Sequence, residues 1–319
     1  MPLDVKKMPT KISAMIGNLA VYLGHCVFAG GIAIQIIACA SGTRVYTIPA
    51  GTDLVKPVAL GSYEYGPILD AIVSVMVRDL NLPAPIGSVT VYPSQVSYEE
   101  GAIAEAREEL ERLRQQLGPK ADQLKEEDFL FGAKRAAVGS AAHARYKKVL
   151  VNEWLLRKSF WADQLRLLAH ELTHVMQMDL VEGRSITADQ WVREGLADWV
   201  GYKVAEVLGA ESFNKGRERA LDLIAERKYY QTFPSLSQLA LNSEWLTWSR
   251  TLGNSGTYGQ AFIAVDFLIT EKGLPAVINY FQFFKKLNNR GRNFATAFGE
   301  PVSTFEERFA KHLDHQLRK

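Results

Sequence analysis

Apolar residues recur three and four positions apart between residues 160 and 176, which is the spacing of a helix with one buried face. The apolar positions are Phe160, Leu165, Leu168, Leu172, Val175 and Met176. Ser159 stands just before this run, where a capping side chain is expected. A second run with helical spacing follows at Trp191, Val192, Leu196, Trp199, Val200 and Val204. Thr187 and Gln190 have capping-box spacing before it, and Gly209 should end it.

Short strands are indicated where apolar and polar residues alternate between turn residues. This alternation runs from Arg44 to Pro49 and from Ser88 to Pro93. The stretch from Tyr146 to Asn152 contains three consecutive branched apolar residues and predicts a further strand before the first helix. A small sheet should therefore precede the two apolar helices.

Helical patterns dominate the rest of the chain. Glu99 to Leu117 is a highly charged helical pattern that ends at a Gly-Pro pair. Beyond the second apolar helix, the spacing continues through Leu221, Leu239, Phe262, Ile278 and Phe305. The sequence thus predicts an α+β fold, with a mixed lobe over residues 41–180 and a helical lobe over residues 181–319.

The amino-terminal 40 residues have the pattern of an export signal or a membrane anchor. No charged residue lies between Ile12 and Thr43, and Lys6, Lys7 and Lys11 precede this run. The run is long enough to cross a bilayer, which takes about 20 apolar residues, although several polar residues interrupt it. A buried core helix is the alternative interpretation.

The residues before Cys39, Ile-Ile-Ala, resemble a bacterial lipobox, in which the lipidated cysteine becomes the first mature residue. Simple cleavage after Ala40 and an uncleaved anchor are the alternatives. Cys26 and Cys39 are the two cysteines of the chain, so the folded part has neither a disulfide nor a thiolate metal site. We therefore expect a location in the bacterial cell envelope, as a membrane-anchored lipoprotein or as a periplasmic or secreted protein.

The first apolar helix carries His170, Glu171 and His174. Residues four apart lie on one helix face with Cβ atoms about 5–6 Å apart, so the two imidazoles can converge on one ion with the carboxylate beside it. A catalytic zinc site also needs a third protein ligand and an open position. Glu194, early in the second helix, is the candidate ligand, and Asp198 lies one turn later on the same face.

Asp198 is expected to accept the free ring N–H of a ligating histidine and so to fix its tautomer. The alternative is a solvated acid on the helix face. The small residues Gly195 and Ala197 should let the second helix pack closely against the first.

Together these two helices resemble the gluzincin metallopeptidases, of thermolysin and aminopeptidase type; the match is close over the helices and loose elsewhere. The resemblance implies a two-lobed fold with Zn²⁺ between the lobes, bound by His170, His174 and Glu194. It implies Glu171 as the general base, and a tyrosine or histidine that stabilises the oxyanion. The chain lacks the Gly-x-Met-Glu-Asn stretch with which aminopeptidases hold a free amine, so exopeptidase activity is unsupported.

Tyr258 is the preferred candidate for that oxyanion role, because it follows a flexible Gly-Asn-Ser-Gly stretch and opens a helical pattern. A core or rim tyrosine is the alternative. His143 and Tyr202 are competing candidates. His312 and His315 belong to a terminal helix that should bury Phe305, Phe309 and Leu313, and they are expected to be exposed or interfacial.

The net charge of the chain argues against nucleic acid as a partner. A formal net charge of +2 and a pI near 8.4 provide no strong field for nucleic acid. We expect a zinc-dependent metallopeptidase with a peptide or protein substrate, held along residues 146–152 at the rim of a cleft. With exopeptidase activity unsupported, we expect an envelope-tethered or exported endopeptidase. A catalytically silent gluzincin-fold scaffold is the alternative, and hydrolysis of other amides, including those of cell-wall peptides, is a third hypothesis.

Overall fold

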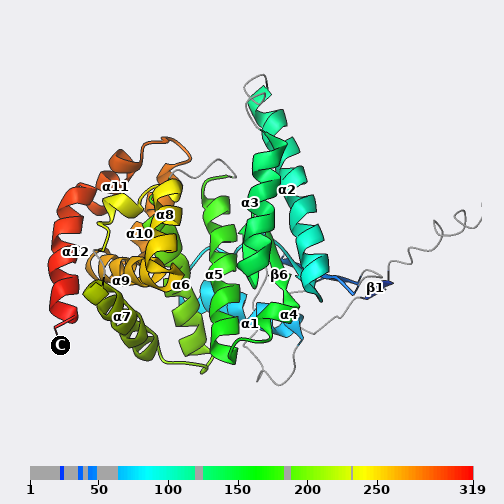
Figure 1. The fold of residues 1–319 in the computed structure, drawn as a ribbon, viewed down its shortest axis with the longest axis horizontal. Helices are drawn as coiled ribbons and strands as arrows, with labels where there is room; N and C mark the ends of the chain where they lie inside the picture. Colours follow the sequence, from blue (N-terminus) through cyan, green and yellow to red (C-terminus); the bar gives the residue numbers. More distant parts are fainter. Residues whose placement is uncertain are drawn as a thin grey trace, which may run out of the picture.

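The sheet and helices of the chain are seen in a computed structural model (Figure 1). It describes residues 22–24, 35–38, 42–48, 64–118, 125–182, 188–230 and 233–318. Over these residues the chain is mostly helical with one small mixed sheet, which confirms the expected α+β class.

The described sheet has the strand order β1-β2-β3-β4-β6-β5. Its strands are β1 (Tyr22–Gly24), β2 (Gln35–Ala38), β3 (Arg44–Ile48), β4 (Gly87–Tyr92), β5 (Ala142–Arg145) and β6 (Lys148–Asn152). The central pair β4 and β6 is parallel and every other pair is antiparallel. The strands expected at residues 44–49 and 88–93 are confirmed as β3 and β4.

Three strands were not expected, namely β1, β2 and β5, and β6 begins later than predicted. β5 and β6 form a hairpin whose turn contains Tyr146, with a left-handed φ of 46°. The predicted strand over 146–152 therefore starts at Lys148. The sequence of β5 is Ala-His-Ala-Arg, which has no large apolar residue to signal a strand.

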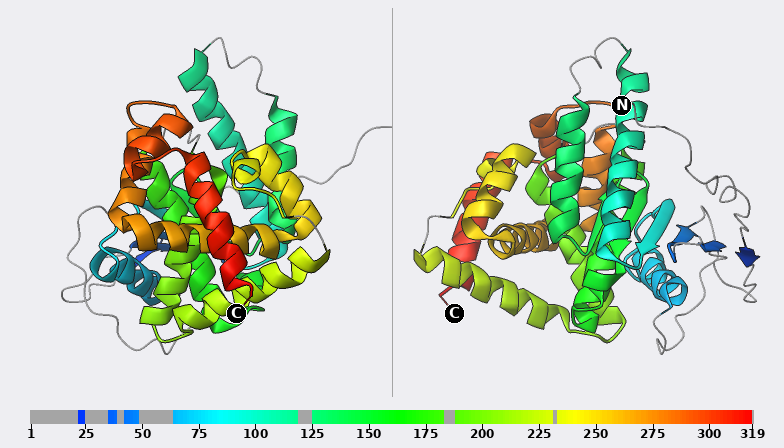
Figure 2. Two further views of the ribbon diagram at one scale, coloured as in Figure 1. Left: turned by 90° about the vertical axis from the view of Figure 1, so that its left-hand side faces the viewer. Right: turned by 45° about the vertical axis from the view of Figure 1, so that its right-hand side comes forward.

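The α-helices of the described residues lie mainly to one side of this sheet, and β1 points away from them (Figures 1 and 2). They are α1 (Tyr65–Ser74), α2 (Gln95–Leu117), α3 (Glu126–Gly139), α4 (Glu153–Leu156), α5 (Trp161–Leu180), α6 (Gln190–Val207), α7 (Phe213–Tyr230), α8 (Asn242–Leu252), α9 (Asn254–Lys272), α10 (Leu274–Phe283), α11 (Arg290–Phe298) and α12 (Val302–Gln316). A π-helical turn over Val75–Asp79 continues α1.

The helix that carries the paired histidines is α5, and its start differs from the prediction. Phe160, not Ser159, is the N-cap residue, and its side chain is 84% exposed rather than part of the buried face. Phe160 has an extended backbone, so it precedes the first helical turn. The other five predicted apolar positions of α5 are buried, as expected.

The second helix, α6, begins at Gln190 with Asp189 as N-cap and without a side-chain cap, so the predicted capping box is wrong. Thr187 lies outside the described residues. The backbone N–H of Gln190 instead donates to the carbonyl of Ala240, a distant residue in the sequence. The predicted end is confirmed, because Gly209 adopts a left-handed φ of 72°.

A helical hairpin of α2 and α3 stands out from the body of the molecule (Figures 1 and 2). Ser94 caps α2 through a capping box with Ser97, so the helix begins before the predicted Glu99. A small apolar cluster fixes the base of the hairpin to the sheet. It contains Tyr98, Ala102, Ala137 and Leu150.

A larger apolar cluster runs from Tyr46 on β3 to Leu313 on α12 and joins both predicted lobes. Within it, α6 packs between α5 and α9. A Cβ atom at Gly195 would meet the carbonyl oxygen of Ala261 and lie 2.6 Å from Val265 Cγ2, both on α9. The expectation that Gly195 faces α5 is therefore wrong. The close approach to α5 is at Gly201, where a Cβ would lie 2.7 Å from the carbonyl oxygen of Arg166.

Most of the predicted export or anchor segment, including Cys26 and Cys39, lies outside the described residues. Its described parts are β1 and β2, which extend the sheet beyond β3. Among the described residues, no helix combines the length and the apolarity that crossing a bilayer requires.

Candidate metal centre

Three ligand atoms converge where α5 packs against α6. The Nε2 atoms of His170 and His174 are 3.1 Å apart. Glu194 Oε2 lies 3.3 Å from each of them. All three side chains are nearly buried, with exposed fractions of 8%, 12% and 7%. The four-residue spacing on α5 and the early position of Glu194 on α6 thus produce a compact triangle.

This triangle has the dimensions of a metal site. A tetrahedral ion with ligands at about 2.0–2.1 Å holds neighbouring ligand atoms about 3.3 Å apart. The observed sides of 3.1 and 3.3 Å match that spacing. Three protein ligands also leave a fourth coordination position for another molecule. His170, His174 and Glu194 could therefore hold a metal ion.

Hydrogen bonds on the far side of each ligand direct its free atom inward. The Asp198 Oδ1 atom is 2.9 Å from His170 Nδ1. A carboxylate oxygen accepts a proton, so Nδ1 carries the hydrogen and Nε2 presents its lone pair to the centre of the triangle. The structure thus places Asp198 where the sequence predicted it.

Two further polar partners were not predicted. Gln177 Oε1 lies 2.9 Å from His174 Nδ1, and the Gln190 amide donates to Glu194 Oε1 at 2.7 Å. A sequence signal existed for both, since Gln177 is three positions after His174 and Gln190 is four positions before Glu194. Residues at these separations share a helix face.

The electrostatics of the group favour one positive charge between the ligand atoms. Burial alone would lower the pKa of His170, but hydrogen bonds to Asp198 and Glu194 raise it to about 10. Burial would raise the pKa of Glu194, yet the neighbouring His174 and His170 hold it well below the usual value. A proton or a metal ion can supply this positive charge, and the two compete for the same nitrogen lone pairs.

Glu171 lies beside the triangle on α5, and its side chain is buried. Its Oε2 accepts a hydrogen bond from the backbone N–H of Ala144 on β5, with a nitrogen–oxygen distance of 2.6 Å. Burial raises the pKa of the Glu171 carboxyl above its ordinary value. A raised pKa makes a carboxylate a stronger proton acceptor, which suits a general base.

Tyr258 on α9 also lies beside the group, with its ring centroid 6.0 Å from that of His170. Its ring forms a T-shaped pair with that of Trp245 on α8, at a centroid separation of 5.0 Å and an angle of 78°. Burial, followed by the carboxylates of Glu194 and Asp198, raises the pKa of Tyr258 well above its ordinary value. The phenol therefore stays protonated and can donate a hydrogen bond.

The competing candidates make contacts outside the triangle. His143 Nδ1 is 2.6 Å from Tyr98 Oη, and its Nε2 accepts from Arg145 Nε at 3.3 Å. Burial and the charge of Arg145 lower the pKa of His143 to about 4. Tyr202 accepts a hydrogen bond from Arg166 at 3.1 Å.

The terminal histidines also lie away from the metal group. His312 stacks on Phe267 with ring centroids 4.2 Å apart, so it lies at an interface between α12 and α9. The same helix buries its predicted apolar positions, which are Phe305, Phe309 and Leu313. Within the described part of the chain, the group of His170, His174 and Glu194 remains the one metal-ligand cluster of this kind.

Comparison with known proteins adds no relative. No family model, curated protein or solved structure matches this chain. The interpretation of His170, His174 and Glu194 as a possible metal site therefore depends on these residues and their geometry.

The edge of the sheet beside Glu171 is β5, not the strand over 146–152 that was expected to form a rim. β6 lies between β4 and β5, so both of its sides are paired and that expectation is wrong. The N–H of Ala144 points away from β6 and reaches Glu171. An extended chain could therefore pair with the outer edge of β5 next to the metal group.

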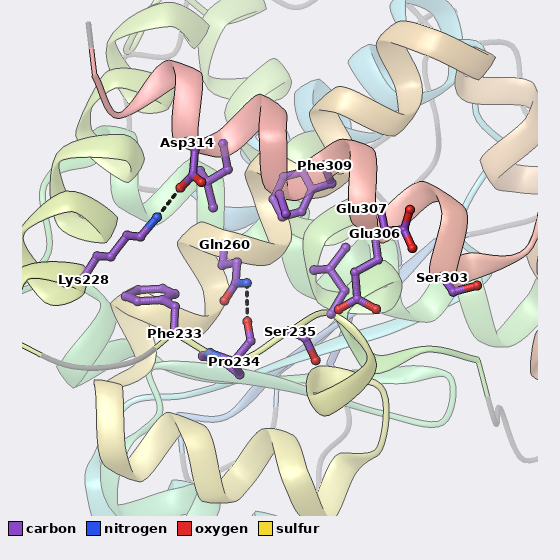
Figure 3. Close-up of a pocket in the computed structure, with 13 residues that line it drawn as sticks. Lys228, Phe233, Pro234, Ser235, Gln260, Ser303, Glu306, Glu307, Phe309 and Asp314 are labelled. Carbon is purple, nitrogen blue, oxygen red and sulfur yellow. Dashed lines mark hydrogen bonds and ion pairs between the residues drawn. The ribbon is translucent and has the colours of Figure 1, made fainter.

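A separate hollow of about 900 Å³ lies between α7, α9 and α12 (Figure 3). Phe233, Leu236 and Phe309 supply apolar walls, and Gln260 donates to the carbonyl of Pro234 at 2.8 Å. Neither the three metal-ligand residues nor Glu171 lines this hollow. It is therefore distinct from the metal centre.

Proposed function

We propose that this chain is a zinc-dependent metallopeptidase that hydrolyses peptide bonds by a metal-activated water. The triangle of His170 Nε2, His174 Nε2 and Glu194 Oε2 is the observation that supports the proposal. Two imidazoles and one carboxylate with an open fourth position are the ligand set of catalytic zinc in many hydrolases. The ligand order along α5 and α6 agrees with a gluzincin-like, two-lobed fold that has zinc between its lobes.

Chain residues supply the proton transfers of the proposed mechanism. When bound, zinc would act as a Lewis acid that polarises the scissile carbonyl and lowers the pKa of water toward neutrality. Glu171 would remove the proton from the attacking water and deliver it to the leaving amine. Its burial and raised pKa suit a group that must both accept and release that proton. Tyr258, kept protonated, would donate to the developing oxyanion.

The substrate would be an extended peptide segment or protein loop paired with the edge of β5. The Ala144 N–H lies on that edge and now binds Glu171, so a bound chain would compete for this donor and leave the carboxylate free for the water. Nothing in the sequence resembles the amine-binding stretch of aminopeptidases, which favours endopeptidase activity. The uncharged run after Lys11 supports an envelope-tethered or exported enzyme, anchored by that segment or by a lipidated Cys39.

Hydrolysis of a mixed, fluorescence-quenched peptide library tests the proposal. The parent should cleave peptides and lose that activity with a chelator. Glu171→Gln should lower the rate by about 10²–10⁴-fold, the usual contribution of a general base, and still bind metal. Glu218→Gln is the control, because it removes the same charge from an exposed position on α7.

Cleavage that survives Glu171→Gln would refute the mechanism. A parent chain that binds metal but cleaves no peptide would favour the scaffold hypothesis, or the hydrolysis of amides other than those in the library.

A further inference from the structure

Two buried glutamines, Gln177 on α5 and Gln190 on α6, both contact Arg193 of α6. Gln177 is fully buried, with Oε1 at 2.9 Å from His174 Nδ1 and Nε2 at 2.9 Å from the Arg193 carbonyl oxygen. Gln190 is 7% exposed and contacts both Glu194 and the Arg193 guanidinium. Arg193 itself immediately precedes Glu194 in the sequence.

The Arg193 carbonyl fixes which way the Gln177 amide points. A carbonyl oxygen can only accept, so the NH₂ group of Gln177 must face it and the amide oxygen must face His174. His174 Nδ1 then has to carry the hydrogen, because it faces an acceptor. The lone pair of His174 Nε2 is consequently left for a metal ion.

The Arg193 guanidinium fixes the second glutamine by the same logic. A guanidinium can only donate, and its Nη1 donates to Gln190 Oε1 at 3.0 Å. The NH₂ group of Gln190 therefore faces Glu194 and donates to Oε1 at 2.7 Å. Glu194 Oε2 is left as the oxygen that lies 3.3 Å from both histidine Nε2 atoms.

We propose that Gln177, Arg193 and Gln190 form an amide bracket that sets the tautomer of His174 and the free oxygen of Glu194 before a metal ion binds. The inference rests on the proposed function in that it assigns positioning residues to the same metal centre. The two groups of the bracket that contact the ligands are neutral amides, so neither places a charge directly against a ligand. Ligands that are ordered during folding lose less entropy on binding, which raises metal affinity.

Two substitutions of Gln177 distinguish the hydrogen bond of its amide oxygen from that of its NH₂ group. Gln177→Leu keeps the approximate size and removes both hydrogen bonds. Gln177→Glu keeps an acceptor for His174 but turns an oxygen toward the Arg193 carbonyl, where two acceptors repel each other. Gln164→Leu is the matched control, because Gln164 is also buried on α5 and donates to a backbone carbonyl, that of Ser159, at 2.9 Å.

Two readouts require no substrate. Metal affinity is measured by competition with a chelator, and the His174 tautomer is measured by ¹⁵N–¹H correlation NMR of the metal-free full chain labelled on histidine. Loss of an outer partner of a ligand typically lowers metal affinity about 10- to 100-fold, and we expect Gln177→Leu and Gln177→Glu to fall in that range. The parent His174 should be the Nδ1–H form and Gln177→Leu should lose this preference, while Gln164→Leu should match the parent in both readouts.

Parent-like affinity and tautomer in Gln177→Leu would overturn the bracket, and so would parent-like metal affinity of Gln177→Glu, whose His174 should keep the Nδ1–H tautomer. If Gln177→Leu does not fold, Gln190→Leu tests the other end and should weaken metal binding by a similar factor. A chain that lacks peptidase activity refutes the proposed function but leaves both readouts intact. A parent that binds no metal refutes the metal centre, and the tautomer in the metal-free chain then decides the bracket separately.

Discussion

Each ligand atom of the candidate centre owes its direction to a hydrogen bond on its far side. His170 is held by Asp198, His174 by Gln177, and Glu194 by Gln190. Such outer partners fix ring tautomers and free oxygen atoms, and they commonly matter nearly as much as the ligands. At the scale of single residues, the site therefore consists of three ligand atoms whose lone pairs are directed to one point, and not merely of three side chains that lie close together.

Tyr258→Phe tests the role of the hydroxyl while the ring packing against Trp245 is kept. If the hydroxyl donates to the oxyanion, kcat should fall by about 10²–10³-fold while KM and zinc content stay near the parent values, because the lost interaction belongs to the transition state. Steady-state kinetics on the best library peptide measures both constants. An unchanged kcat would show that Tyr258 contributes only its ring packing against Trp245.

Asp70 on α1 should make stability depend on pH. Among the described residues, none bonds to its buried Oδ1 atom, and burial raises its pKa to about 6 from 3.8. The folded chain therefore holds this proton more tightly than the unfolded chain. Its contribution to stability is full below about pH 4 and is lost as the pH rises through about 6.

Asp70→Asn should remove the loss of stability that accompanies ionisation of the buried carboxyl. The variant should therefore be more stable than the parent at pH 7 and differ less from it at pH 4. Urea unfolding at both pH values measures the difference. Asp222→Asn, an exposed position on α7, is the charge-matched control. Equal stabilities of Asp70→Asn and the parent at pH 7 would show that the carboxylate carries no burial penalty.

The sequence could indicate which residues of each helix share the candidate site, because helical periodicity fixes those relations locally. His170 and His174 share a face of one helix, and so do Glu194 and Asp198. The orientation of Gln177 depends instead on the Arg193 carbonyl, which only the packing of two helices brings into reach. Partners of that kind have no local signal.

At the scale of elements, the site is held by the close packing of α6 between α5 and α9. Gly195 follows the ligand Glu194 directly, and its missing side chain lets α6 contact the α9 backbone. Gly201 does the same toward α5. The sequence indicated small residues in α6 but not which neighbour each one faces.

Gly195→Ala should destabilise the fold by about 1–3 kcal/mol, the usual cost of overpacking, since the new Cβ would lie 2.6 Å from Val265 Cγ2. The shift of α6 should also displace Glu194 and weaken metal binding. Gly259→Ala is the control, because its Cβ would be 3.5 Å from the nearest atom. Thermal unfolding and metal competition measure both effects. Equal stability of the two variants would contradict the packing account.

Elements with a strong local pattern were predicted and those stabilised by distant partners were not. The long apolar face of α5 is evident in the sequence, whereas β5 is short and depends on pairing with β6. The start of α6 is set by the distant carbonyl of Ala240. Capping rules that use neighbouring residues could not locate it.

At the scale of the whole molecule, one apolar cluster joins the sheet to the terminal helix α12, so the parts expected as two lobes share a core. The α2–α3 hairpin projects from this body (Figure 1). Ion pairs of Lys148 with Glu105 and Glu108 connect the hairpin to β6. The periodicity predicted the charged helix but not its projection, because the arrangement of helices in space depends on contacts far apart in the sequence.

Cys39→Ser tests the proposed attachment to the envelope. A lipoprotein would be cleaved before Cys39, which would remove β1 and β2 and leave β3 at the sheet edge. In a bacterial host the parent should fractionate with membranes and have a lipidated mass beginning at Cys39, and the variant should lose both properties. Unchanged membrane retention and processing in the variant would exclude lipidation and favour a plain signal or an uncleaved anchor.

The zinc content of the purified chain tests the central claim most directly, because it needs no assumption about the substrate. The account predicts one zinc ion per chain after reconstitution, bound equally by Glu171→Gln and lost in both His174→Ala and Glu194→Ala. A parent chain that binds no zinc, or variants that bind it as the parent does, would contradict the metal centre on which the proposed chemistry depends.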